Sequence, residues 1–241
     1  MRHPKIRDLP AFIPDGAPRM GLTKADAAYA EIRASILSCD LAPGSVIDQE
    51  MVAAWLSSST TPVREALRRL EAEQLVVMRA HSEARVAPTS VEEFREFHLV
   101  RLGLEPLAAE IATTIVSDEV IESLRPLVTP SAKKRKQAAV DLDRSRTFHQ
   151  TIYAASGNHT LTQILDSIWD RVGRYRVLLA GVGSVSSWES EEHQAIFAAF
   201  EARDQTTIGK LIRADLEASY QQLLPALEAA LGEVEKADVG A

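Results

Sequence analysis

The sequence has almost no cysteine and no long apolar run, and both absences narrow the class of protein. Cys39 is the one cysteine among 241 residues, so no disulfide can form within the chain, and a reducing cytoplasm fits. No apolar segment approaches the roughly 20 residues that a membrane-spanning helix requires. Residues 1–21 are rich in proline and lack the apolar core of a signal peptide, so we expect a flexible tail there and a cytoplasmic protein without a membrane partner.

The chain also lacks the excess of positive charge that is typical of general nucleic-acid binders. Its formal net charge is −7. Residues 1–88 contain 11 basic and 11 acidic residues, whereas residues 89–241 contain 16 and 23, so the excess of acid lies in the second part. A neutral domain can still bind DNA when its arginines gather on one face. We therefore expect only modest non-specific affinity for DNA.

The segment TTPVREALRRLEAEQLV, residues 60–76, has the pattern of a short amphipathic helix. Thr61 is a candidate N-cap, and Pro62 suits the first helical position, where a missing N–H costs nothing. Arg64 and Arg68 lie one turn apart on one face. Four apolar residues have the spacing of a buried face: Val63, Ala66, Leu67 and Leu70. Such a helix suits the DNA major groove, although a solvated surface helix has the same pattern.

Two helices are predicted before this segment and two strands after it. A turn at Pro43-Gly44 separates the two helices, and Asp48 is a plausible cap for the second. Their apolar stripes are Tyr29, Ile32, Ile36 and Leu37, then Met51, Val52, Trp55 and Leu56. Residues 75–78 and 84–87 are predicted to form strands around a polar turn. Three helices and a hairpin make a winged helix-turn-helix over residues 22–88.

Residues 89–241 are predicted to be helical throughout. Helical spacing begins after a capping box at residues 90–93 and continues to about residue 115, with Pro106 expected to break or kink the helix. Further helices are expected over residues 138–155, 161–182, 190–202 and 206–231. The fold class is therefore mainly α: an N-terminal winged helix-turn-helix followed by an all-α bundle.

Both parts resemble known domains. The segments IRASILSCDLAPGSVI, TPVREALRRLEAEQLV and ARVAP resemble the GntR family of bacterial transcription regulators. The segments FHLVRLGLEPLAAEIA, FHQTIYAASGN, RYRVLLA and EEHQAIFAAFEARD resemble the FCD effector domain of the FadR subfamily. The resemblance implies a homodimer that binds a palindromic operator in double-stranded DNA, usually as a repressor. It also implies that residues 89–241 dimerise and bind a small organic acid, frequently with a divalent metal.

The resemblance implies a set of DNA-contacting residues, and two of them depart from the family pattern. Thr60 stands where an arginine is usual, and Gln49 replaces the arginine of an acidic–arginine pair. Losing an arginine that contacts guanine costs about 1–3 kcal/mol of discrimination at that base. Either the operator differs from the family norm, or DNA is bound weakly. The full set is Gln49, Ser59, Thr60, Thr61, Arg64, Arg68, His81 and Ser82.

Four residues occupy the positions of the family's metal ligands, which are usually one aspartate and three histidines: Ser145, His149, His193 and Asp215. Ser145 therefore replaces an aspartate, and Asp215 replaces a histidine. Two imidazoles, a carboxylate and a hydroxyl would hold Zn²⁺, Ni²⁺ or Mn²⁺ more weakly than the four-ligand relatives do. The alternative is a pair of buried histidines that hydrogen-bond to Asp215 without a metal.

Residues from three segments are candidates for binding the effector. Arg101 matches the family arginine that helps to hold an acid, and a guanidinium suits a carboxylate; an ion pair with Glu105 or Glu110 is the alternative. Arg174 is a weaker candidate on the predicted long helix, as are Arg171 and Arg176, and at least one of these three arginines is expected to lie on the surface. Asn158 is the candidate in the third segment, although a helix-ending role is the alternative there.

We expect a ligand-responsive regulator and not an enzyme, because the sequence contains no P-loop, G-x-G-x-x-G or H-E-x-x-H motif. Two other hypotheses stay open. A metal-dependent enzyme of the 2-His-1-carboxylate type would use the same histidines and Asp215. An effector-binding dimer that no longer contacts DNA would explain Gln49 and Thr60.

Overall fold

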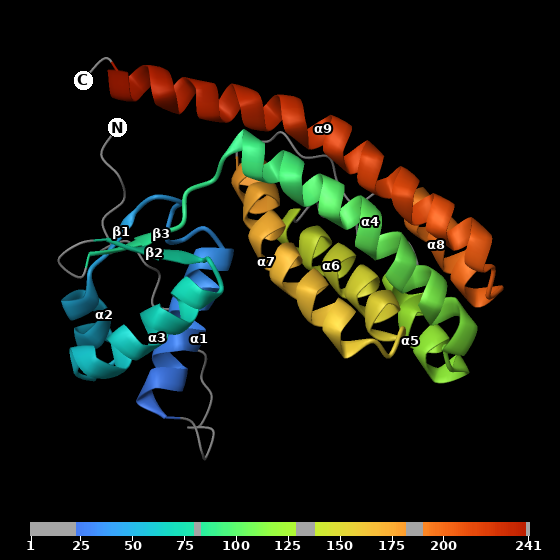
Figure 1. Ribbon diagram of the computed structural model, residues 1–241, viewed down its shortest axis with the longest axis horizontal. Coiled ribbons are helices and arrows are strands. Elements are labelled where there is room, and N and C mark those ends of the chain that lie inside the picture. The colour runs from blue at the N-terminus through green and yellow to red at the C-terminus, as the bar shows by residue number, and fades with distance from the viewer. Residues whose placement is uncertain (1–22, 80–82, 129–137, 182–189, 240–241) are drawn as a thin grey trace. The chain divides into compact units, whose positions relative to one another are not determined.

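The computed structural model describes residues 23–79, 83–128, 138–181 and 190–239 (Figure 1). The predicted tail, residues 1–21, lies outside this range, as do His81 and Ser82 of the predicted turn. Contacts divide the chain into two compact units, residues 1–89 and 90–241. The predicted boundary was at residue 88. That residues 1–21 are a flexible tail and that residues 89–241 bind an effector and dimerise stay predictions.

The first unit contains three helices and a three-stranded antiparallel sheet (Figure 1). The helices are α1 (Lys24–Leu37), α2 (Gln49–Trp55) and α3 (Thr60–Ala72), and the strands are β1 (Val46–Ile47), β2 (Val76–Met78) and β3 (Ala84–Val86). Strand β3 lies between the others, with Arg85 paired to Val77 on one side and to Val46 on the other. The predicted winged helix-turn-helix is confirmed. β1 was missed because two residues are too few to show a strand period.

The core of this unit is the predicted one on α1 and α3. The four predicted α3 residues are completely buried, and they pack with Ile32 and Ile36 of α1. The stripe predicted on α2 was partly wrong. Met51 and Trp55 are 40% and 44% exposed, whereas Val52 and Ala53 are buried. The two turns of α2 bury one narrow face, so only half of the predicted stripe is covered.

The start of α3 differs from the prediction by one residue. The helix begins at Thr60 with Ser59 as N-cap, so Pro62 is its third residue. This position is tolerated because none of the first four N–H groups of a helix has an acceptor within the helix. Asp48 caps α2 as predicted, accepting hydrogen bonds from the backbone N–H groups of Glu50 and Met51.

The second unit is helical in all its described parts, as predicted. Its helices are α4 (Val91–Ile115), α5 (Asp118–Val128), α6 (Ala138–Ala154), α7 (His159–Gly181), α8 (Ser190–Glu201) and α9 (Gln205–Val239). Helix α4 contacts α6, α7 and α9 along its length (Figure 1). None of the helices in the described ranges combines the length and apolarity that crossing a bilayer requires.

The prediction was that Pro106 would break or kink α4, and the structure excludes the break. The helix continues through Pro106, and α9 likewise continues through Pro225. A proline inside a helix costs about 3 kcal/mol. Pro106 is buried, as are Glu105 and Ala108 near it in the sequence. The helix continues because the packing of this buried segment stabilises it by more than the lost hydrogen bond costs.

Candidate functional site

The exposed face of α3 presents the predicted DNA-contacting arginines. Arg64 and Arg68 are exposed, and the Nε of Arg64 donates a hydrogen bond to Oε1 of Gln49 at 3.1 Å. The structure thus brings together one predicted residue from α2 and one from α3. This bond uses only the Nε–H of the guanidinium. The outer edge of the guanidinium, formed by its two Nη atoms, is left for another acceptor. Ser59 and Thr61 are exposed beside it, and Thr60 is half-buried.

A third arginine on α3 serves the packing of α1 against α3. Arg69 donates to Asp26 at 2.8 Å, and its guanidinium lies 4.1 Å from the centre of the Tyr29 ring. Hydrogen bonds from Arg69 and from Thr23 lower the pKa of Asp26 to about 2. Arg69 therefore holds the two helices together, while Arg64 and Arg68 project from the exposed face.

The second unit brings three of the four predicted metal ligands together. His149 is on α6, His193 on α8 and Asp215 on α9. The Nε2 atoms of the two histidines are 3.1 Å apart, and Oδ2 of Asp215 lies 3.5 Å from Nε2 of His149. Both imidazoles are buried, and one ligand atom from each residue lies within 4.8 Å of the others.

The hydrogen bonds of His149 determine which ring nitrogen carries the proton. The hydroxyl of Tyr153 donates to Oε2 of Glu105 at 2.6 Å, so its oxygen must accept from Nδ1 of His149 at 3.1 Å. The lone pair of Nε2 then faces His193 and Asp215. This is the arrangement by which outer hydrogen bonds orient metal-binding histidines in other proteins.

The geometry of the His149, His193 and Asp215 cluster fits a divalent metal. Ligands held at 2.0–2.1 Å from a tetrahedral zinc ion are about 3.3 Å apart, and Nε2 of His149 lies 3.1 Å from Nε2 of His193 and 3.5 Å from Oδ2 of Asp215. Burial, and then the neighbouring His193, hold the pKa of His149 well below its ordinary value, so the ring is in the neutral form that ligates. Without a cation, His193 would donate to His149, and the carboxylate would face a lone pair.

The fourth predicted ligand, Ser145, is buried on α6 one turn before His149. Residues four apart lie on the same helix face, so its hydroxyl is on the side of the cluster. Burial raises the pKa of Asp215. A neutral hydroxyl and this carboxylate make a weaker donor pair than the aspartate and histidine usual in relatives.

Arg101, the first predicted effector residue, is engaged with Glu105. Its Nε donates to Oε1 of Glu105 at 2.5 Å, and both side chains are buried. The guanidinium also lies 4.7 Å from the centre of the Trp169 ring. The alternative of an ion pair with Glu105 therefore holds in this structure. Through Tyr153, the pair is hydrogen-bonded to His149.

Two further predicted effector residues, Asn158 and Arg174, have different surroundings. Asn158 is exposed, and its Oδ1 accepts from the backbone N–H of Leu161, so it caps the start of α7, whereas Gly157 with φ +65° ends α6. Arg174 is completely buried on α7. Side chains two residues apart on a helix point about 200° apart. Arg174 therefore faces away from the side that Arg176 occupies.

Arg176, which was one of the weaker effector candidates on the long helix, lies beside the cluster. Burial, and then the charge of Arg101, lower its pKa to about 10, and its charge in turn acts on His149 and Asp215. Tyr153 was missed, whereas Glu105 was predicted only as a possible partner of Arg101. Spacing could have revealed Tyr153, since it stands four residues after His149.

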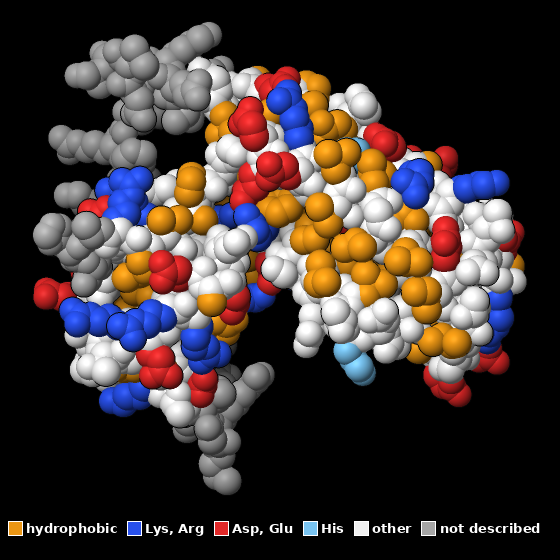
Figure 2. Space-filling model, viewed as in Figure 1, with side chains coloured by type: hydrophobic (Ala, Val, Ile, Leu, Met, Phe, Trp, Pro, Cys, Tyr) orange, Lys and Arg blue, Asp and Glu red, His pale blue; other side chains and the backbone are white. Residues whose placement is uncertain are grey.

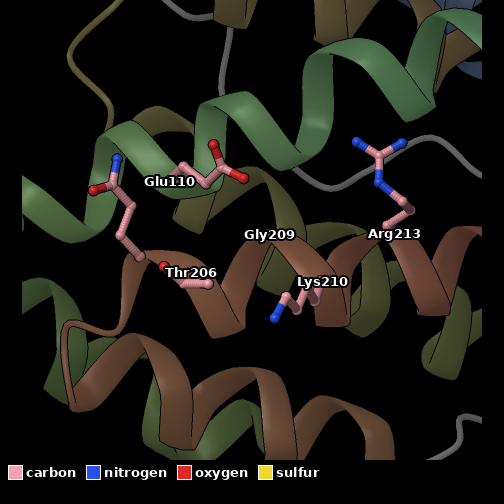
Figure 3. Close-up of a pocket in the computed structure, with 6 residues that line it drawn as sticks. Glu110, Thr206, Gly209, Lys210 and Arg213 are labelled. Atoms are coloured by element: carbon pink, nitrogen blue, oxygen red, sulfur yellow. The ribbon is translucent and has the colours of Figure 1, made fainter.

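A surface cleft of about 300 Å³ lies between α4 and the start of α9, and none of the predicted site residues lines it (Figure 3). Glu110 of α4 extends over Gly209 of α9, with Lys210 and Arg213 on the same helix (Figure 3). The cleft is open to solvent and carries charges of both signs, so we assign no ligand to it.

The fold and the two sites define a class: a DNA-binding regulator with a separate helical domain that contains a buried metal-type cluster. Comparison with protein families agrees. Residues 24–86 match the bacterial regulatory proteins of the gntR family, and residues 96–218, about half of the chain, match the FCD domain. The chain belongs to the GntR family and carries an FCD domain, the architecture of the FadR-like members. It is a DNA-binding transcription regulator, and the family and its named relatives are regulators, not enzymes.

Several curated relatives are named as repressors. The HTH-type transcriptional repressor GlaR of Escherichia coli strain K12 is 28% identical over 82% of this chain and 94% of its own. A probable D-xylose utilization operon transcriptional repressor of Paenarthrobacter nicotinovorans is 30% identical over 67% of this chain and 71% of its own. Among solved structures, a putative GntR regulator from Rhodococcus sp. RHA1 has a TM-score of 0.70 at 17% identity and covers 85% of this chain and 99% of its own. E. coli McbR/YncC has a TM-score of 0.66 at 19% identity, over 83% and 99%. These structures support the fold.

Proposed function

We propose that the protein is a cytoplasmic, homodimeric repressor whose helical domain binds a small carboxylate beside a divalent metal. The observation that carries the DNA-binding part is Arg64, exposed on α3 and hydrogen-bonded by Gln49. A guanidinium with its outer edge exposed suits the O6 and N7 acceptors of guanine. Gln49 thereby orients Arg64, a role that a glutamine can fill in place of the usual arginine. The replacement at this position is therefore no sign that the domain has lost DNA binding.

The metal part of the proposal rests on His149, His193 and Asp215. Their separations match ligands around one ion, and the Tyr153 hydrogen bond turns the lone pair of His149 toward the shared centre. These residues would hold the ion, with Ser145 beside them, and the ion would supply positive charge for an anionic effector. The order of affinity follows from the donors, with Zn²⁺ and Ni²⁺ above Mn²⁺.

The dimer part rests on an exposed apolar stripe of α4, formed by Val100, Leu107 and Ile115. These residues are 43%, 44% and 59% exposed, and their spacing of seven and eight residues places them on one helix face. Leu99, which is 69% exposed, extends the stripe. Figure 2 shows hydrophobic side chains gathered on one face of the helical domain. A second copy suits this stripe, because a two-fold axis places the same uncharged surface on both sides of the interface.

The effector would act by favouring one arrangement of the two DNA-binding domains. This requires that it bind the two arrangements with different affinity. The test measures, by fluorescence anisotropy, the affinity of the protein for two duplexes: DNA from the region upstream of its own gene, called the upstream DNA, and a scrambled sequence. Both titrations are repeated from about 50 to about 200 mM salt. We expect preference for the upstream DNA at every salt concentration, and its loss when zinc and a carboxylate are added. Equal affinity for both duplexes throughout would contradict the proposal.

A further inference from the structure

The face of α7 toward the histidine cluster contains two buried hydrogen-bond donors. Trp169, Gly173 and Arg176 stand at positions i, i+4 and i+7, and so share one helix face. The indole Nε1 of Trp169 and the Nε of Arg176 are both buried, and neither has a hydrogen-bond partner among the residues that the structure describes. Buried donors of this kind are rare unless something binds them.

Between these two donors, Gly173 leaves room. A Cβ added to Gly173 would meet no atom within 4 Å in the described structure. A glycine inside a helix is destabilising by about 0.5–1 kcal/mol relative to alanine. The space beside it lies between a large ring and a long cation on the same face, and a small ligand could enter it.

The charges around this space favour an anion. Arg101, which lies over the Trp169 ring, already forms a close ion pair with Glu105, whereas the Nε–H of Arg176 remains available. Asp215 is the acidic residue whose charge acts most strongly on Arg176. A metal bound by Asp215 would neutralise that negative charge, and Arg176 would then lack an acidic partner. A carboxylate would satisfy both Arg176 and the indole N–H.

We infer that Arg176 is the residue that anchors the effector's carboxylate, with Trp169 as a second donor and Gly173 providing the space. This inference rests on the proposed function, since it names the anchor of the same acid-binding site. Arg101 then has a structural role, because it neutralises Glu105, which orients Tyr153 and through it His149.

The experiment measures carboxylate affinity of the full-length, zinc-loaded protein by calorimetry. The probes are acetate, succinate and benzoate, each compared with its neutral amide. Arg176→Met removes the donors but keeps an unbranched apolar chain, and Gly173→Leu fills the space without changing charge. Gly232→Leu is the matched control, because Gly232 is also a helical glycine with no atom within 4 Å of an added Cβ.

We expect the wild type and Gly232→Leu to bind at least one of the acids more tightly than its amide. Arg176→Met should lose about 10- to 100-fold in affinity, as removal of a charged hydrogen bond does. Gly173→Leu should lose binding altogether. If both variants bind like the wild type, Arg176 is not the anchor and the proposed function stands. If the wild type itself does not prefer any acid to its amide, the carboxylate-binding function fails, and this inference with it.

Discussion

The Tyr153 hydroxyl connects the Arg101–Glu105 ion pair to the metal-type cluster, and removing it tests how the cluster is oriented. Tyr153→Phe deletes one oxygen and keeps the ring in a completely buried site. In the wild type this oxygen accepts from Nδ1 of His149 and donates to Glu105. Without it, either ring nitrogen of His149 can carry the proton, and the lone pair no longer faces His193 in every molecule.

The magnitude follows from the number of bonds lost. Removing one outer hydrogen-bond partner of a metal ligand weakens metal binding by about 10- to 100-fold, which is about 1.4–2.8 kcal/mol. The unfolding free energy should also fall by about 1–3 kcal/mol, because Nδ1–H of His149 loses its partner in the buried site. Glu105 is less affected, since it keeps its bond with Arg101.

The assay is a zinc titration of metal-stripped protein against a competing chelator at constant pH. Tyr175→Phe is the matched control, because Tyr175 is also completely buried and its hydroxyl contacts the Glu93 carboxylate and the backbone N–H of Ser90. The control should lose stability and keep zinc affinity. An unchanged zinc affinity in Tyr153→Phe would refute the orientation argument, and absence of zinc binding in the wild type would refute the metal site itself.

Three further predictions concern the cores and the dimer. Leu67→Ala, at a completely buried position of α3, should cost about 2–5 kcal/mol in urea unfolding, whereas the exposed Val77→Ala should stay within about 0.5 kcal/mol; equal effects would contradict the described core. Arg101→Met should cost about 3–5 kcal/mol because it leaves the Glu105 carboxylate buried without its ion pair, and adding Glu105→Gln should restore most of the loss in thermal melts. Leu107→Glu places a charge in the α4 stripe and should convert dimer to monomer in sedimentation velocity, and a mass unchanged from the wild type would argue against that interface.

The sequence was sufficient for the elements with a strong helical period. The buried residues of α3 follow from apolar spacing. The limits of α6 to α8 follow from apolar spacing and from helix-ending residues such as Gly157, and the observed limits lie within a few residues of the predicted ones. Two features were beyond such reasoning. Pro106 does not break α4 because tertiary packing exceeds a local preference, and β1 is too short for a pattern.

Site residues could be predicted from the sequence where a single position matches a known family position. His149, His193 and Asp215 are distant in sequence, and the resemblance to the FCD domain, not their spacing, predicted that they meet. The pair of Arg101 with Glu105 was one of the predicted alternatives, and the two residues stand four apart on α4. The position of Arg176 beside the cluster depends on how α7 is rotated against the helices that it packs on. That rotation is set by packing of many residues, and no local pattern encodes it.

We propose that α3 contacts DNA bases through Arg64, and comparing the affinities of Arg64→Ala and the wild type for two duplexes tests this. On the upstream DNA, the variant should lose about 1–3 kcal/mol, which is roughly 5- to 150-fold in Kd, whereas its affinity for a scrambled duplex should change little. Arg95→Ala, which removes an exposed arginine of the helical domain, should bind both duplexes like the wild type. If Arg64→Ala retains the wild-type preference for the upstream DNA, the assignment of α3 as the base-contacting helix is wrong.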